Sequence, residues 1–83
     1  MKVTLSAAAK KQFLRINEPA FSRIAAGIDK LKKEPPEGDI KKLQGRNDYR
    51  LRVGVYRILF RKETDGIYVT NISTRGGAYK GQR

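Results

Sequence analysis

Arginine side chains recur at alternate positions in the second half of the chain, a pattern suited to binding phosphate. Arg50 and Arg52 alternate with apolar residues, and Arg57 follows in the next apolar run. A guanidinium group is a planar fork that contacts two phosphate oxygens at once, whereas a Lys ammonium group is a hydrated point charge. Seven of the nine Arg lie in residues 45–83, and eight of the ten Lys lie in residues 1–44. We therefore expect phosphate to bind to the second half of the chain.

The rest of the composition limits the chemistry that is available. The 83-residue chain contains no Cys and no His, which excludes thiol nucleophiles, thiolate metal sites and the usual general base at neutral pH. Any catalysis must therefore use Tyr, Lys, Arg, Asp or Glu. The 19 Lys and Arg outnumber the eight Asp and Glu, and the resulting net charge of +11 predicts a polyanion or an acidic protein as the partner.

The hydrophobic period indicates which elements hold these arginines, because it changes along the chain from that of a helix to that of a strand. Residues 2–5 alternate and predict a short strand, and amphipathic helices are expected at 7–16 and 19–33. The remaining segments are a polar connection at 34–48 and strands at 49–53, 55–62 and 67–74. The last nine residues are expected to lack regular structure.

Cap and turn residues mark the ends of these elements. Ser6 is a suitable N-cap for the first helix, and two prolines at 35–36 end the second. Gly54 allows a tight turn between two strands, and the Asp-Gly pair at 65–66 is a strong hairpin signal. The three strands of the second half are therefore expected to follow one another as an antiparallel meander.

Together these elements predict a single α+β domain over residues 1–83. A chain this short buries only roughly 60% of the surface that its unfolded form exposes, so one small core is expected. The N-terminal strand and the helical hairpin are expected to pack on one face of a curved antiparallel β-sheet. The opposite face is then open to solvent, and the alternating arginines belong on it. Tyr49 and Tyr56 fall on the covered, apolar face.

A nearly continuous motif begins at residue 42. Residues 42–45 read Lys-Leu-Gln-Gly, and residues 49–60 read Tyr-Arg-Leu-Arg-Val-Gly-Val-Tyr-Arg followed by three apolar residues. Residues 72–75 (Ile-Ser-Thr-Arg) follow later, with Tyr79 four positions after Arg75. This arrangement resembles the RelE/ParE superfamily of toxins. The family pattern is Lys-Leu-x-Gly, then Tyr-Arg-x-Arg-x-Gly-x-Tyr-Arg with three apolar residues, then a terminal His-Arg-x-x-x-Tyr element, in which Thr74 takes the place of the His. The resemblance covers nearly the whole chain and implies the RelE-like fold.

The resemblance also implies a type II toxin that acts as a RelE-like mRNA interferase. Such a protein enters the ribosomal A site and cleaves mRNA by attack of a ribose 2′-OH on the adjacent phosphate. The products are a 2′,3′-cyclic phosphate and a free 5′-OH, and no metal or other cofactor is required. The reaction needs a base for the 2′-OH, positive charge beside the phosphate, and a proton donor for the 5′-oxygen.

Five residues are expected to provide this chemistry. Arg50, Arg52, Arg57 and Arg75 are expected to hold the scissile phosphate, and Arg75 or Arg57 to protonate the leaving oxygen. Tyr79 is the candidate general base, because neighbouring guanidinium groups favour the phenolate form. Further contacts to RNA are expected from five basic residues, namely Lys41, Lys42, Arg46, Arg61 and Lys80.

The expected partners follow from the resemblance and from the charge. They are a cognate antitoxin, the 70S ribosome and its mRNA, with a higher-order toxin–antitoxin complex as a further form. The antitoxin segment that binds so basic a domain should be acidic and amphipathic. No run approaches the roughly 18 apolar residues of a membrane span, so a cytoplasmic protein is expected.

Two alternatives remain open at this point. A ParE-like protein would inhibit DNA gyrase by binding alone, and Thr74, where a His is common in the family, keeps this alternative open. A basic RNA- or DNA-binding module without toxicity is the second alternative. The set of four arginines with one tyrosine favours the ribonuclease, because binding to gyrase does not require guanidinium groups beside a phenol.

Overall fold

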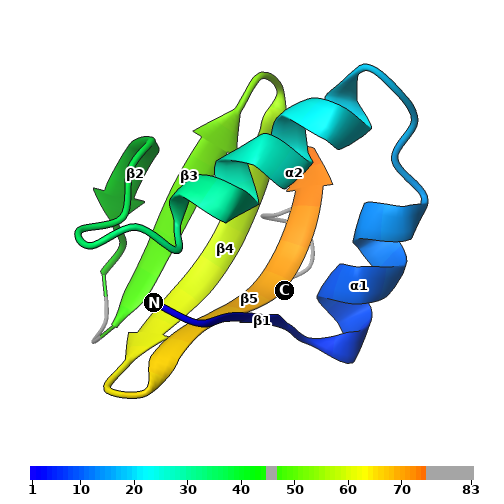
Figure 1. The fold of residues 1–83 in the computed structure, drawn as a ribbon. Coiled ribbons are helices and arrows are strands. Elements are labelled where there is room, and N and C mark those ends of the chain that lie inside the picture. Colours follow the sequence, from blue (N-terminus) through cyan, green and yellow to red (C-terminus); the bar gives the residue numbers. More distant parts are fainter. Residues whose placement is uncertain (45–46, 75–83) are drawn as a thin grey trace.

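Two helices cover one face of a five-stranded sheet in the computed structural model, which describes residues 1–44 and 47–74 (Figure 1). In chain order the elements are β1 (Val3–Leu5), α1 (Ala7–Leu14), α2 (Ala20–Lys30), β2 (Asp39–Lys42), β3 (Asp48–Val53), β4 (Tyr56–Glu63) and β5 (Gly66–Thr74). The strand order across the sheet is β1-β5-β4-β3-β2. The predicted α+β architecture is therefore confirmed. Neither α1 nor α2 is long and apolar enough to cross a membrane.

The sheet is mixed, because its first strand runs parallel to its neighbour. The strands β2, β3, β4 and β5 pair antiparallel, whereas β1 pairs parallel with β5 and places Val3 opposite Ile67. Tight turns force consecutive strands to be antiparallel, but β1 precedes both helices and no turn connects it to β5. The antiparallel prediction thus holds for the four later strands and not for β1.

One strand forms where the sequence predicted only a polar connection. The strand β2 pairs with β3 and places Ile40 opposite Leu51. Ile40 packs against the core, while the other three residues of β2 are exposed. A single apolar residue in a run of charges gives no alternation to recognise, which is why the prediction missed this strand. As the edge strand, β2 places Asp39 and Lys41 beside the arginines of β3.

The helices begin and end close to the predicted positions. The Ser6 hydroxyl accepts a hydrogen bond from the Ala9 N–H at 3.0 Å, which confirms Ser6 as the N-cap of α1. The helix α1 ends at Leu14, two residues earlier than predicted, and α2 occupies the centre of the predicted segment 19–33. The apolar stripe of α2 faces the sheet, as its periodicity predicted.

The core lies between the two helices and the sheet. The buried core side chains are Ala9, Ile24, Ile28, Leu31, Leu51, Ile58, Phe60, Ile67, Val69 and Ile72. The rings of Phe13 and Phe21 stack with their centroids 4.4 Å apart and join α1 to α2. Side chains alternate between the two faces of a strand, so the residues between the core positions of β3 and β4 point away from the helices.

Candidate nucleic-acid interface

The β3–β4 hairpin brings together arginines from two strands. A two-residue turn at 54–55 connects the strands. Gly54 has a φ of +59°, a left-handed conformation that favours glycine, and it occupies the first central position of the turn, as glycine does in a type II′ turn. This turn fixes the register in which Arg52 lies directly opposite Arg57. The predicted turn residue therefore sets the geometry of the predicted arginines.

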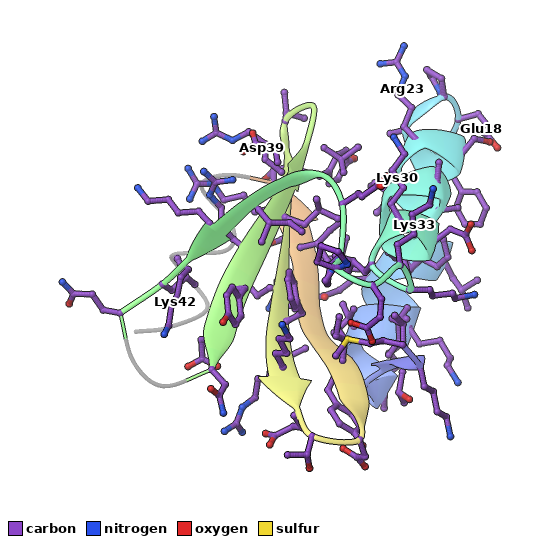
Figure 2. All side chains as sticks on the ribbon, turned by 60° about the vertical axis from the view of Figure 1, so that its left-hand side comes forward. Glu18, Arg23, Lys30, Lys33, Asp39 and Lys42 are labelled. Atoms are coloured by element: carbon purple, nitrogen blue, oxygen red, sulfur yellow. The ribbon has the colours of Figure 1, made fainter. Side chains whose placement is uncertain are left out.

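The side chains on the sheet face opposite the helices form a surface that we call the arginine face. Figure 2 shows Arg23, Lys30 and Lys33 on the helical side, while nitrogen-tipped side chains project from the other side of the sheet. By strand alternation and register, the arginine face consists of Thr4, Asp39, Lys41, Asp48, Arg50, Arg52, Arg57, Leu59, Arg61, Glu63, Tyr68, Asn71 and Ser73. Five of these thirteen residues are cationic and three are acidic, so the surface is net positive.

The centre of the positive charge is a row of residues that crosses the strands. Asp39 lies opposite Arg52, Arg52 opposite Arg57, and Arg57 opposite Ser73. Within the described part of the chain, Arg52 is exposed and forms no ion pair, since the Asp39 carboxylate contacts Arg50 instead. Two like charges directly opposite each other destabilise a sheet. A bound anion would relieve this repulsion, which makes the pair a suitable phosphate site.

Arg50 is held differently from Arg52. Its Nη1 donates to the Asp39 carbonyl oxygen at 3.2 Å and lies 3.5 Å from Asp39 Oδ1. The Arg50 side chain is only 12% exposed, whereas the Asp39 side chain is 61% exposed. Arg50 thus ties the edge strand β2 to β3 and adds positive charge beneath the surface. The sequence pattern predicted that Arg50, like Arg52, binds phosphate directly. The geometry favours a position behind the phosphate site, from which Arg50 adds positive charge.

Arg61 lies at the opposite end of the arginine face and is locally neutralised. Its Nε is 3.6 Å from Asp48 Oδ1 and 3.8 Å from Glu63 Oε2. All three side chains are about half exposed, so solvent screens each contact and its stabilising effect is small. Among the described residues, Arg52 at the other end of the face has no such carboxylate contact.

The described tyrosines offer no group suited to act as a base beside these arginines. Tyr49 and Tyr56 lie on the helical side of the sheet, as predicted. Tyr68 lies opposite Arg61, and its hydroxyl donates to Asp65 Oδ2 at 2.7 Å. That hydrogen bond, together with desolvation and the nearby carboxylates, raises the pKa of Tyr68 above its ordinary value of 10.0. Tyr68 is therefore a neutral phenol and a poor general base near neutral pH.

The arginine face contains five of the predicted site residues, namely Arg50, Arg52, Arg57, Lys41 and Arg61. Lys42 lies opposite Tyr49 and therefore projects from the helical side of β2. Four predicted residues lie outside the described residues, namely Arg46, Arg75, Tyr79 and Lys80.

Two polar residues of β5 join the site and were not predicted. Ser73 lies opposite Arg57, and its hydroxyl donates to Asn71 Oδ1 at 2.9 Å. They reach the arginine face because β5 contains a bulge: Leu59 pairs with Asn71, Phe60 pairs with Val69, and Thr70 is the extra residue. The bulge reverses the inside–outside alternation within the strand. The sequence contained one sign that Asn71 and Ser73 share a face, because a polar residue lies on each side of the buried Ile72.

The carboxylates on this surface are paired with its cations. Asp39 contacts Arg50, and Asp48 and Glu63 contact Arg61. The described part of the chain contains no group of three or more Asp or Glu side chains that could hold a metal ion.

Comparison with known proteins identifies the fold. No family model matches the sequence, and no curated protein sequence matches it either. A chain of the crystal structure of the RelB–RelE antitoxin–toxin complex from Methanococcus jannaschii superposes with a TM-score of 0.81 and 25% sequence identity, covering 96% of this chain and 99% of that one. A chain of the archaeal RelE–RelB complex from Pyrococcus horikoshii OT3 gives a TM-score of 0.76 at 24% identity, covering 90% and 94%. The resemblance seen in the sequence is thereby confirmed, and the chain has the RelE-like toxin fold over nearly its whole length.

Proposed function

We propose that this protein is the toxin of a type II toxin–antitoxin system and a ribosome-dependent endoribonuclease that cleaves mRNA in the A site. The observation that supports this most is the Arg52–Arg57 pair, in which two guanidinium-bearing residues from different strands lie opposite each other on the sheet face that the described helices leave uncovered. Such a pair is unfavourable by itself and favourable around a phosphate. The RelE-like fold supports the same proposal, since both similar structures are toxin–antitoxin complexes.

The proposed reaction is transfer of the scissile phosphate to the neighbouring ribose oxygen. The 2′-oxygen loses its proton to a base, forms a bond to phosphorus and displaces the 5′-oxygen, which takes up a proton. Arg52 and Arg57 hold the phosphate oxygens and stabilise the negative charge that builds on them. Arg50 adds to the field from beneath. Tyr79 is the proposed base, and Arg75 or Arg57 is the proposed proton donor.

The same proposal includes partners and a location in the cell. Contacts with ribosomal RNA are proposed for five basic residues: Lys41 and Arg61 on the arginine face, Lys42 on the other side of the sheet, and Arg46 and Lys80, which lie outside the described residues. An acidic antitoxin is proposed to neutralise the protein, because a domain with a net charge of +11 attracts an acidic segment. A toxin that acts on translating ribosomes works in the cytoplasm.

Primer extension on mRNA bound to programmed 70S ribosomes tests the proposal. The full chain should produce cuts at the A-site codon, and Arg52→Ala should reduce the cleavage rate strongly. Arg23→Ala is the matched control, because Arg23 is an exposed arginine on α2 at the other side of the sheet. Equal cleavage by both variants, or no codon-dependent cleavage by the wild-type protein, would contradict the proposal.

One observation favours the second candidate, a ParE-like inhibitor of DNA gyrase that acts by binding. The arginine face, as far as the structure describes it, holds Tyr68 as its one phenol, and that phenol is kept neutral. A protein that acts by binding needs no base. Inhibition of gyrase-catalysed supercoiling by the purified chain, without cleavage of mRNA, would establish this alternative.

A further inference from the structure

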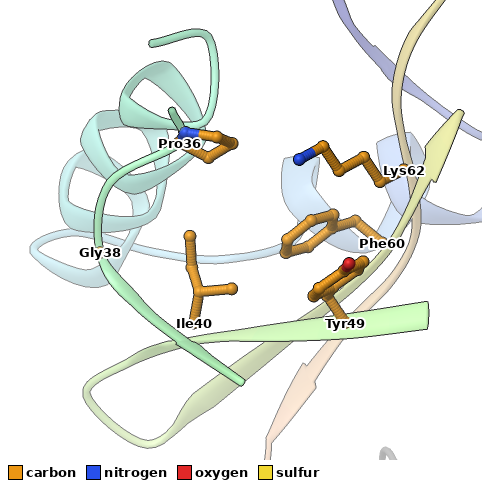
Figure 3. Close-up of a pocket in the computed structure, with 6 residues that line it drawn as sticks. All are labelled: Pro36, Gly38, Ile40, Tyr49, Phe60 and Lys62. Atoms are coloured by element: carbon orange, nitrogen blue, oxygen red, sulfur yellow. The ribbon is translucent and has the colours of Figure 1, made fainter. Parts of the chain in front are cut away.

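A cavity of about 320 Å³ lies on the helical side of the sheet, away from the arginine face (Figure 3). Its lining residues are Pro36, Gly38, Ile40, Tyr49, Phe60 and Lys62. They come from the connection after α2 and from β2, β3 and β4, so the cavity lies near the β2 edge. Its volume is at the lower end of the roughly 300–1,000 Å³ of small-ligand pockets, which suits one large side chain.

Most residues that line this pocket are apolar or aromatic, and they already pack against one another or against the core. The rings of Tyr49 and Phe60 stack with their centroids 5.4 Å apart and an angle of 13° between their planes. Phe60 is buried, and Ile40 packs against the same core. Gly38 brings the connection over β3 so closely that a Cβ atom there would lie 2.7 Å from Leu51 Cδ1. An occupant would therefore enter a preformed site, which lowers the entropic cost of binding.

The rim of the pocket is cationic. Figure 3 shows Lys62 next to Phe60, with Tyr49 on the other side of the Phe60 ring, and Lys62 forms no ion pair with any residue that the structure describes. Lys42 projects from the same side of the sheet, opposite Tyr49. Glu37, an acidic residue of the connection, contacts Lys33 at 3.6 Å. An apolar floor with uncompensated positive charge at its edge suits an apolar side chain that has carboxylates next to it.

We propose that this pocket anchors an apolar side chain of the acidic antitoxin, whose neighbouring carboxylate pairs with Lys62. This inference rests on the proposed function, because it names where the partner in that function binds. A buried apolar anchor surrounded by charged contacts is the usual arrangement of binding energy at a protein interface. The anchor lies on the side of the sheet opposite Arg52 and Arg57, so neutralisation and RNA cleavage depend on different residues.

A nucleobase is the competing occupant, since a ring could stack on Tyr49 with its phosphate near Lys62. The geometry favours the peptide, because RNA bound on the arginine face is separated from this pocket by the sheet. Lys62 is also the one cation among the residues that line the pocket, whereas the arginine face presents a row of cations.

The test uses the full chain and a defined peptide, acetyl-Glu-Glu-Phe-Leu-Glu-Glu-amide, in an NMR titration that follows backbone amides. Saturable binding should perturb the amides of Ile40, Tyr49 and Lys62, and the same peptide with Ala for Phe and Leu should bind at least about tenfold more weakly. Ile40→Ser and Lys62→Glu should each weaken binding about tenfold. Lys10→Glu, the same charge change on α1 at the far end of the sheet, should have a much smaller effect.

Three outcomes would overturn the inference. They are equal binding of the Phe-Leu and Ala-Ala peptides, unchanged binding by folded Lys62→Glu, and displacement of the peptide from the pocket by adenosine monophosphate. A cleavage assay of Lys62→Glu on programmed ribosomes distinguishes failure of this inference from failure of the proposed function. That variant should cleave at the wild-type rate, and a wild-type protein that does not cleave would remove the function while leaving the peptide result intact.

Discussion

Arg52 and Arg57 lie directly opposite each other on β3 and β4, on the sheet face that the described helices leave uncovered. The acidic residue next to them in the register, Asp39, turns its carboxylate to Arg50 and leaves Arg52 without a counter-ion among the described residues. Like charges placed in this way oppose pairing of the strands by about 0.2–1 kcal/mol. The hairpin thus places two like charges opposite each other, and a bound anion would reduce their repulsion.

The first prediction separates activity from stability at Arg52. Arg52→Ala should lower the rate of cleavage on programmed ribosomes by about 10²–10³-fold, the usual effect of removing one preorganised donor. The same change removes the repulsion with Arg57, so the free energy of unfolding should stay the same or rise by about 0.2–1 kcal/mol. Cleavage rates and urea unfolding measure the two quantities. A variant that loses both activity and stability would show that Arg52 supports the fold instead.

The second prediction compares how much Arg52 and Arg61 contribute to the salt dependence of ribosome binding. Binding to 70S ribosomes should weaken steeply with salt, because each neutralised phosphate releases counterions. Arg52→Ala should reduce the slope of log K against log salt by about one, as expected for one lost phosphate contact. Arg61→Ala should change the slope less, because Asp48 and Glu63 already neutralise Arg61. Equal slopes for the two variants would contradict this ranking.

Much of the fold could be predicted from local patterns in the sequence. Ser6 as a cap, the apolar stripe of α2 and the turn at Gly54 are each determined by neighbouring residues, and the structure confirms them. The predicted Asp-Gly hairpin at 65–66 also forms, with its turn at 64–65 and with Gly66 as the first residue of β5. Alternation within β3 and β4 was sufficient to place Arg52 and its neighbours on one face.

The rest depended on contacts between distant segments. The direction of β1 is set by its pairing with β5 and not by a turn. The strand β2 has only Ile40 as an apolar signal, so its existence and the side taken by Lys42 follow from pairing with β3. The bulge at Thr70, which brings Asn71 and Ser73 to the arginine face, arises from register with β4. None of these features has a local period in the sequence.

The third prediction concerns the connection that forms one wall of the apolar pocket. Gly38 has a φ of +133°, which an L side chain rarely adopts, and an added Cβ would lie 2.7 Å from the Leu51 side chain. Gly38→Ala should therefore lower the free energy of unfolding by about 1–3 kcal/mol, through backbone strain and displacement of Leu51. Urea unfolding measures the loss. Gly54→Ala is a useful comparison, because its φ is also positive but nothing lies within 4 Å of the added atom. A larger loss at Gly54 would show that the close packing over Leu51 contributes little.

The last prediction tests which tyrosine transfers a proton. The hydrogen bond from Tyr68 to Asp65 stabilises the neutral phenol and raises the pKa of Tyr68 above 10.0. Because the folded protein holds this proton more tightly than the unfolded chain, the bond stabilises the fold below about pH 10. That stabilisation disappears as the pH rises through the raised pKa. Wild-type protein should therefore lose more stability than Tyr68→Phe between neutral and strongly alkaline pH, as measured by urea unfolding across that range.

The same variant distinguishes Tyr68 from Tyr79 in the proposed reaction. Tyr68 stays protonated at neutral pH and is bound to Asp65, so Tyr68→Phe should cleave mRNA at nearly the wild-type rate. Tyr79→Phe should still bind ribosomes but lose cleavage, because the ribose hydroxyl then has no base. Loss of cleavage in a folded Tyr68→Phe variant, with full activity in Tyr79→Phe, would reverse the assignment. It would move the reaction to the Arg61 end of the arginine face, where Asp65 would have to release the phenol before it could act.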